Sequence, residues 1–503
     1  MKLQPVIGLE THVQLKTKSK LFSASSNDSD NSAPNQNICA IDLGHPGILP
    51  VLNEQAVRFA ILLGLALNGK IATKSKFDRK HYFYPDLPKA YQISQFDVPV
   101  MSDGHLTFDV PGEVEPFTIK LERLHLEEDA AKNIHGEDGK TYVDYNRAGT
   151  PLCEIVTHPQ FTSAAQAKAY LQELRLLARH LKVSDANMEK GHLRCDVNIS
   201  LREVDENGVP LSASLSPKTE IKNVNSFKAV ERVIEYEIKR QTKMWEEGNK
   251  PMVLTTRGWN DAKQITEEQR VKEEAADYKF FPEPDLPPMD LTEMTDEIRR
   301  QIPELPTARK NRLQTEYGFK ADDVKQIVDD PELADFAENA LSELGAWLQS
   351  MPDITPDQME VERRKLTKLF SGWLLSKLGG LLAERKIDIQ TMKITPENFA
   401  EFILLLAKGE LTGPNALKVL DEMLNSGGDP SQIMEDIGAK RVDDSDALQM
   451  IVDEVIESNP DEAERFRNGD KKLMQFFIGQ IIKASRGNAD PAQSAKIISQ
   501  KLK

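Results

Sequence analysis

A carboxylate and an imidazole share one face of the first predicted strand. Residues 6–15 read V-I-G-L-E-T-H-V-Q-L, and apolar and polar side chains alternate along them. A period of two predicts a β-strand with one buried face, so Glu10 and His12 lie together on the other face. Two residues along a strand span about 7 Å. That spacing suits two ligands of one metal ion or two groups that hold one substrate, although an exposed face of an antiparallel sheet gives the same pattern.

A second strand of the same design is predicted at residues 192–202, H-L-R-C-D-V-N-I-S-L-R. Its apolar side chains occupy one face, and Arg194, Asp196 and Asn198 lie on the other. A forked cation, a hard oxygen ligand and a neutral hydrogen-bonding group are what a phosphate and its metal ion need. The strand is therefore either part of a functional site or a solvated sheet face.

Two further polar clusters precede the second strand. Glu127, Glu128 and Asp129 are adjacent, and three neighbouring carboxylates either point into water or need a cation such as a metal ion to neutralise them. Residues 79–89, R-K-H-Y-F-Y-P-D-L-P-K, mix cations with aromatic rings. This segment is either a clamp for a nucleotide, with cations for the phosphates and rings for the base, or a structured loop.

Several motifs with well-defined chemistry are absent from the sequence. It contains neither G-x-x-x-x-G-K-[ST] nor G-x-G-x-x-G, so any use of ATP requires a different phosphate cradle. It also lacks the G-x-S-x-G nucleophile elbow. The chain is therefore expected to handle phosphate and metal but not to hydrolyse an amide by itself.

The elements that must position these residues change character along the chain. Up to about residue 285 the pattern is strand-like, with helices predicted at 164–181 and 226–245. Six prolines between residues 281 and 306 mark a boundary, and helical spacing follows it. The predicted fold class is α+β: a large, sheet-rich, cradle-like catalytic domain (1–292), an all-α connector (293–408) and a small helical tail domain (409–503).

Composition indicates a soluble globular protein. Of its 503 residues, 39% are hydrophobic and 29% charged. The longest apolar stretch, residues 59–67, is too short to span a bilayer, and Asn53 and Gly69 are the caps expected for that helix. We find no signal or transit segment, and the three cysteines are far apart. A cytoplasmic location without a membrane anchor is expected.

Charge is distributed unevenly along the chain. The net charge of −16 argues against a surface covered with nucleic-acid contacts, but residues 464–503 carry nine basic and three acidic side chains. Such a local excess of positive charge suits a phosphate backbone. A lysine-rich helical end that only adds solubility is the alternative.

Six strings in order resemble the B subunit of the aspartyl/glutamyl-tRNA(Asn/Gln) amidotransferase family. They are V-I-G-L-E-T-H-V-Q-L, Y-P-D-L-P-K-x-Y-Q-I-S-Q, L-E-E-D-A-A-K, M-E-K-G-H-L-R-C-D-V-N-I-S-L, T-E-I-K-N-V-N-S-F and D-Y-K-F-F-P-E-P-D-L-P-P. The resemblance runs from residue 6 to the C-terminus. Its last hundred or so residues resemble the helical tail domain that this family shares with a small stand-alone helical protein.

The resemblance implies a tRNA-dependent ligase that works with partner chains. Such a protein uses ATP and Mg²⁺ to phosphorylate the side-chain carboxylate of glutamate or aspartate wrongly attached to tRNA(Gln) or tRNA(Asn). Ammonia from the amidase (A) subunit then displaces the phosphate, and a small (C) subunit completes the heterotrimer. The tail is expected to help bind the misacylated tRNA.

The resemblance also implies roles for individual residues. It assigns Glu10, His12, Arg194 and Asp196 to catalysis, and Lys80, Tyr82, Lys89 and Asn198 to ATP or the activated carboxylate. The implied metal ligands are Glu10, His12, Glu127, Glu128 and Glu154. Because imidazole is an unusual ligand for Mg²⁺, a softer ion such as Mn²⁺ is an alternative at His12.

The sequence departs from the family pattern at two places that matter. Ala90 stands where the family usually has glycine, and the single Cys39 replaces a cysteine-rich zinc motif found in some members, so no structural zinc is expected.

Two other functions are compatible with the residues: a metal-dependent carboxylate kinase or ligase that acts on a free small molecule, and a non-catalytic tRNA-binding scaffold.

Overall fold

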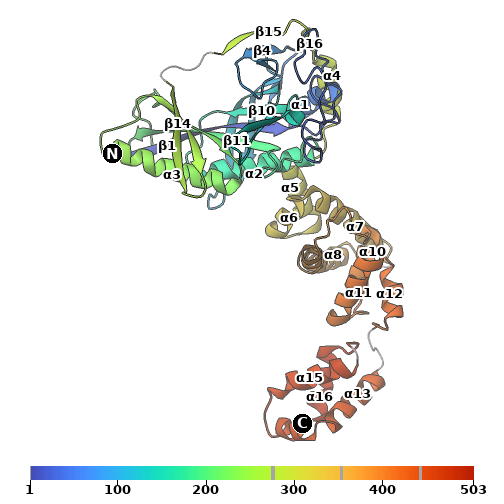
Figure 1. The fold of residues 1–503 in the computed structure, drawn as a ribbon. Helices are drawn as coiled ribbons and strands as arrows, with labels where there is room; N and C mark the ends of the chain where they lie inside the picture. Colours follow the sequence, from blue (N-terminus) through green and yellow to red (C-terminus); the bar gives the residue numbers. More distant parts are fainter. Residues whose placement is uncertain (1, 273–277, 352–354, 441–444, 486, 503) are drawn as a thin grey trace. The chain divides into compact units, whose positions relative to one another are not determined.

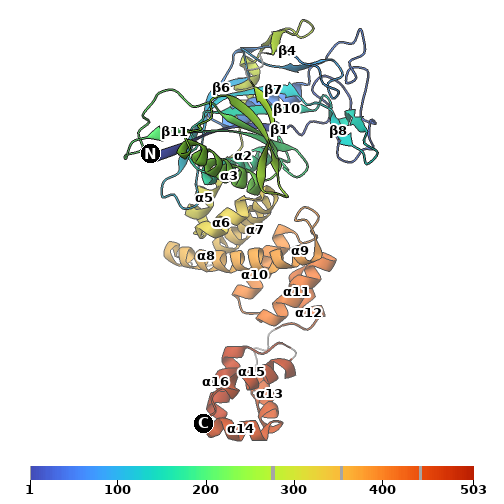
Figure 2. The same cartoon turned by 60° about the vertical axis from the view of Figure 1, so that its left-hand side comes forward.

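The chain folds as two compact units, residues 1–306 and 307–503 (Figures 1 and 2). The computed structural model describes residues 2–272, 278–351, 355–440, 445–485 and 487–502. The first unit contains a large sheet, and the described part of the second is helical. This arrangement confirms the predicted α+β fold class.

Strand β1 (Lys2–Gln14) lies in the middle of a sheet to which the described residues contribute nine strands. Its antiparallel neighbours are β10 (Pro151–Thr157) and β11 (Leu193–Val204). Beyond β10 follow β7 (Phe117–Glu128), β6 (Met101–Phe108) and β2 (Lys70–Ile71); beyond β11 follow β12 (Thr219–Val224), β13 (Leu254–Asn260) and β14 (Ile265–Lys272). Only β12 and β13 run parallel among these pairs. The two strands predicted from alternation are thus nearest neighbours.

Helices cover the apolar face of this sheet (Figure 1). They are α1 (Glu54–Ala66), α2 (Ala164–His180) and α3 (Phe227–Glu246). Ile7, Leu9 and Val13 of β1 are fully buried in this core. Each such side chain contributes about 1.5–3 kcal/mol, so apolar burial fixes which face of β1 turns away from the helices.

The caps of these helices follow the sequence closely. The side chains of Asn53, Ser163 and Ser226 accept hydrogen bonds from the first-turn backbone N–H groups of α1, α2 and α3, as N-caps do. The predicted helices 164–181 and 226–245 and the cap Asn53 are confirmed. The predicted cap Gly69 donates its backbone N–H to the Gly64 carbonyl of α1 at 3.0 Å, while the left-handed position that ends the helix is Asn68 (φ 55°).

Smaller sheets stand beside the large one. Strand β4 (Asp78–His81) lies between β15 (Lys279–Pro282) and β5 (Tyr91–Ser94). Two further pairs are β3 (Lys74–Ser75) with β16 (Met289–Asp290), and β8 (Lys132–His135) with β9 (Thr141–Asp144). The β15–β4–β5 sheet carries the aromatic and basic segment 79–89.

The proline-rich segment folds onto the first unit. Helix α4 (Thr292–Arg300) follows β16, and its Ile298, with the preceding Leu291, is buried in the same core as β1. The division between the units therefore falls after Pro306, and the predicted boundary at 292 lies next to side chains of the first core.

The described part of the second unit is helical and has two cores. One spans residues 313–439 and the other residues 448–502. The first contains α5 (Pro306–Tyr317), α6 (Ala321–Val328), α7 (Pro331–Gln349), α8 (Pro356–Ser371), the π-helix Gly372–Leu378, α9 (Gly379–Arg385), α10 (Pro396–Ala407), α11 (Gly413–Ser426) and α12 (Pro430–Asp436). The second contains α13 (Ser445–Glu457), α14 (Pro460–Arg467), α15 (Leu473–Ala484) and α16 (Pro491–Lys501). Because α11 and α12 share a core with α10, the predicted boundary at residue 408 lies within the first of these cores.

None of the described helices combines the length and the apolarity that a bilayer span requires.

Candidate functional site

The open face of the large sheet carries the polar residues of β1. Glu10 lies opposite Asp196 of β11, and His12 lies between Arg194 of β11 and Glu154 of β10. Residues directly opposite each other in an antiparallel pair have Cβ atoms about 5 Å apart. The strand register therefore brings together side chains from widely separated parts of the sequence.

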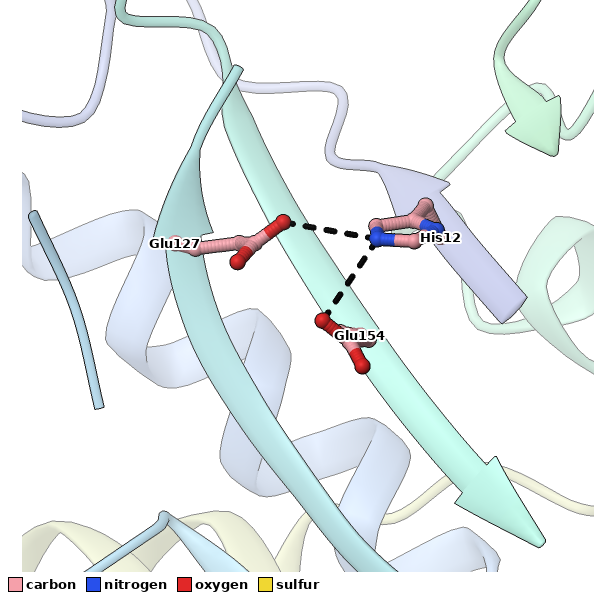
Figure 3. Close-up of side chains that lie close together, drawn as sticks. All are labelled: His12, Glu127 and Glu154. Atoms are coloured by element: carbon pink, nitrogen blue, oxygen red, sulfur yellow. Dashed lines mark ion pairs between the residues drawn. The ribbon is translucent and has the colours of Figure 1, made fainter. Parts of the chain in front are cut away.

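His12, Glu127 and Glu154 form a cluster that we call the histidine cluster (Figure 3). The His12 Nε2 atom is 3.5 Å from Glu127 Oε1 and 3.5 Å from Glu154 Oε2. His125, the cross-strand partner of Glu154, adds a second imidazole 3.3 Å from Glu154 and 3.6 Å from Glu127. Two imidazoles and two carboxylates thus form a quartet, of which the carboxylates and His125 are largely buried.

Mutual pairing shifts the pKa of each group in the quartet. Burial lowers the pKa of the His12 imidazole, but its contacts with Glu127 and Glu154 outweigh burial and raise that pKa to about 10. Burial likewise lowers the pKa of His125, whereas Glu154 and Glu127 raise it to about 9. Burial raises the pKa of both carboxyls, yet the two imidazoles hold each well below its usual range. At neutral pH two imidazolium cations therefore balance two carboxylates.

Glu10, Asp196 and Glu220 form a second cluster, the carboxylate cluster. One ligand oxygen from each lies within 4.8 Å of the others. The Lys222 ammonium is 3.0 Å from Glu220 and 3.4 Å from Asp196, and the Asn198 amide donates to Glu10 Oε1 at 2.8 Å. Lys222 thus offsets part of the negative charge of these three carboxylates, and the Asn198 amide orients one of them.

A cleft with a volume of about 670 Å³ joins the two clusters. Its lining includes Glu10, His12 and Glu154 from the large sheet and Lys80 from β4. The remaining lining residues are Tyr84, Ser94, Gln95, Phe96, Arg123, His125, Asp196, Glu220, Lys222, Thr256, Gln269, Tyr278 and Phe280. The cleft therefore combines acidic, basic and aromatic groups, and its volume is typical of ligand sites.

Some predicted site residues lie outside the clusters. Glu128 pairs with Lys89 and accepts a hydrogen bond from the Ile93 N–H. Adjacent strand residues point to opposite faces, so Glu127 and Glu128 cannot both reach His12. Arg194 pairs with Asp129 at 2.5 Å. Tyr82 lies close to Lys80, whose ammonium is 5.9 Å from the centre of its ring.

Three site residues, His125, Glu220 and Lys222, were missed by the sequence reasoning. His125 is two positions before Glu127, so strand alternation alone places both on one face of β7. Glu220 is opposite Asn198 in the β11–β12 pair, and no local pattern reveals that these strands are neighbours. The omission of His125 was avoidable, whereas Glu220 and Lys222 lie on β12 and depend on sheet topology.

The two clusters suit different metal ions. Mg²⁺ prefers oxygen ligands in octahedral geometry, and the carboxylate cluster offers three carboxylates. The histidine cluster offers one imidazole nitrogen and two carboxylates, a set that better suits Mn²⁺ or a similar transition metal. Both donor sets fit a divalent cation. A metal at His12 must displace the imidazole proton, because only neutral imidazole binds a metal.

Comparisons with known proteins agree with this geometry. Residues 5–297 match the GatB/GatE catalytic domain, and residues 359–502 match the GatB domain. The chain belongs to the GatB/GatE family. It is similar to the B subunit of the aspartyl/glutamyl-tRNA(Asn/Gln) amidotransferase of Rippkaea orientalis, at 43% identity over 100% of this chain and 98% of that one. The corresponding protein of Thermoanaerobacter pseudethanolicus is 42% identical over the full length of both chains.

Ala90, where the resemblance predicts glycine, has an unusual backbone conformation. It adopts the left-handed conformation with φ 62°. That conformation costs an alanine about 1–2 kcal/mol. The turn between Lys89 and β5 therefore carries a local energetic cost.

Proposed function

We propose that this chain is the part of a tRNA-dependent amidotransferase that activates a carboxylate carried by tRNA. Its substrates are ATP and glutamate or aspartate misacylated on tRNA(Gln) or tRNA(Asn), in keeping with the names of its relatives. The supporting observation is the cleft that holds two metal-capable acidic clusters beside Lys80 and Lys222.

The proposed reaction has two steps. A side-chain carboxylate oxygen attacks the γ-phosphorus of ATP, the bond to ADP breaks, and an acyl phosphate forms. Ammonia then attacks the acyl carbon, loses a proton, and releases inorganic phosphate to leave the amide. Because a carboxylate oxygen is a very poor leaving group, the first step makes the second feasible.

The chain's own residues would mainly position reactants and balance charge, as phosphoryl transfer requires. Glu10, Asp196 and Glu220 would hold Mg²⁺, which supplies charge neutralisation to the phosphates of bound ATP. Asn198 orients Glu10 through its 2.8 Å hydrogen bond. Lys80 and Lys222 extend into the same cleft and would bind phosphate oxygens.

The histidine cluster would hold the second metal ion. His12, Glu127 and Glu154 are its ligands in this proposal, and His125 holds both carboxylates in place. Arg194, opposite His12 in β11 and paired with Asp129, would act as a positioning residue. Lys89 and Glu128 form an ion pair apart from both clusters, and we assign neither to the metal.

Ammonia is proposed to come from a partner amidase, the A subunit, with a small third chain, the C subunit, completing a heterotrimer. The relatives are named as B subunits, which supports a complex of several chains. The helices of the second core, residues 448–502 within the tail predicted at 409–503, would contribute to tRNA binding through the basic residues near the end of the chain. An assembly of this kind would work in the cytoplasm, where aminoacyl-tRNAs are used.

The deciding experiment measures ATP cleavage and amidation by the assembled complex. We expect misacylated tRNA to stimulate ATP cleavage, and Glu10→Gln and Glu220→Gln to reduce amidated tRNA at least a hundredfold. Glu115→Gln, which changes an exposed carboxylate outside the cleft, serves as the matched control. A rate of ATP cleavage that is the same with and without misacylated tRNA would refute the tRNA-linked reaction. Full activity of both cleft variants would refute the site.

A further inference from the structure

Aromatic side chains gather where the β15–β4–β5 sheet borders the cleft. The rings of Phe96 and Phe280 are stacked, with centres 4.4 Å apart and planes inclined by 15°. Tyr84 and Tyr278 line the same cleft. These four side chains, which we call the aromatic platform, come from segments nearly 200 residues apart in the sequence.

Three of the four platform side chains are exposed to solvent, so they do not serve mainly to pack the protein core. Phe96 is 60% exposed, Tyr84 61% and Tyr278 46%. Phe281, next to the platform residue in β15, points to the other face of that strand, where its ring stacks on His81. Exposed aromatic side chains gathered on one cleft favour a binding site there.

Cations accompany these rings. The Lys80 ammonium lies 5.0 Å from the centre of the Tyr278 ring. Arg123 and Lys222 line the same cleft. Ring faces on which successive bases stack, with cations beside them for the backbone, are the usual design of single-stranded nucleic-acid sites.

We propose that the aromatic platform stacks on the unpaired 3′ end of the tRNA. This inference rests on the proposed function, in which the reacting carboxylate hangs from the last nucleotide. Bases held on the platform would place that carboxylate in the same cleft as the two acidic clusters. The presence of three exposed rings also favours an RNA strand over ATP, which has only one base to stack.

The experiment compares binding of two RNAs to the assembled complex: intact tRNA and the same tRNA without its last three nucleotides. Fluorescence anisotropy gives both dissociation constants without any amidation. We expect the truncation to weaken binding to the wild-type complex about tenfold, the effect of losing a stacked base. Phe96→Ala and Tyr84→Ala should weaken binding of intact tRNA by a similar factor and abolish most of the difference between the two RNAs.

Two controls separate stacking from misfolding and from ATP binding. Phe280→Tyr keeps a ring and should retain wild-type affinity, whereas Tyr142→Ala removes an exposed ring on the β8–β9 hairpin and should leave both constants unchanged. The affinity for ATP should be unchanged in Phe96→Ala.

The results that would overturn the platform are distinct. A fall in ATP affinity with unchanged tRNA binding would assign the rings to adenine of ATP. If Phe96→Ala and Tyr84→Ala weakened the binding of intact and truncated tRNA equally, or weakened neither, the platform would have no role at the 3′ end. A complex that binds as expected but never amidates would refute the proposed function and leave the platform standing.

Discussion

Replacing His12 by glutamine tests the electrostatic balance of the histidine cluster. Glutamine can still donate a hydrogen bond but carries no charge. Glu127 and Glu154 would then share the single remaining cation, His125. Removing one partner of a buried ion pair is strongly destabilising, because it leaves charge uncompensated.

The pKa of His12 sets the size of the effect. The imidazole has its ordinary pKa of 6.5 in the unfolded chain and about 10 in the folded one. Because the folded value is higher, the stabilisation is complete below pH 6.5 and disappears as the pH rises through 10. At 1.36 kcal/mol per pKa unit, the pairing contributes about 5 kcal/mol at pH 6 and about 3 kcal/mol at pH 7.5.

The assay is urea unfolding of the metal-free protein at pH 7.5 and pH 10.5. We expect His12→Gln to unfold with a free energy about 3 kcal/mol lower than wild type at pH 7.5, and less than 1 kcal/mol lower at pH 10.5. His105→Gln, at an exposed position, controls for the loss of an imidazole elsewhere. If the gap between His12→Gln and wild type were the same at both pH values, the charge-pairing argument would be refuted.

Three further predictions follow from other features. Mn²⁺ binding at pH 7.5, measured by calorimetry in buffers of different ionisation enthalpy, should release about one proton in wild type and none from the altered site in His12→Gln, since His12 must deprotonate to bind metal. Ala90→Gly should raise the free energy of unfolding by up to about 1 kcal/mol, because relief of the left-handed strain exceeds the added flexibility of the unfolded chain. A lower free energy of unfolding in urea would contradict this. Removing residues 441–503 should weaken tRNA binding and leave ATP binding intact, whereas removing residues 409–503 should also lower the unfolding temperature, because Val419 and Leu420 are fully buried in the core shared with α10.

Local periodicity was enough to predict two strands of the site, β1 and β11. Glu10 and His12 share a face because apolar residues alternate with them, and burial of Ile7 and Leu9 enforces that choice. The same reasoning, applied to β7, would have joined His125 to Glu127 and separated Glu128. Strand parity is thus informative even where the fold is unknown.

Pairing between distant strands was beyond local reasoning. Glu154 reaches His12 only because β10 lies beside β1, and Glu220 reaches Asp196 only because β12 lies beside β11. Domain limits were equally non-local. Prolines report where regular hydrogen bonding stops, but Leu291 and Ile298 lie in the first core because of contacts with residues far earlier in the chain.

The central place of β1 also determines when the site can form during synthesis. Ile7 pairs with Ile199, so about 190 further residues must be synthesised before β1 can pair with β11. At ordinary elongation rates this takes about 10–40 s. Until then the edge of β1 that pairs with β11 lacks its partner, a state that invites association with other chains. We therefore expect the nascent first unit to depend on a chaperone, and the carboxylate cluster, which needs β11 and β12, to assemble after the histidine cluster.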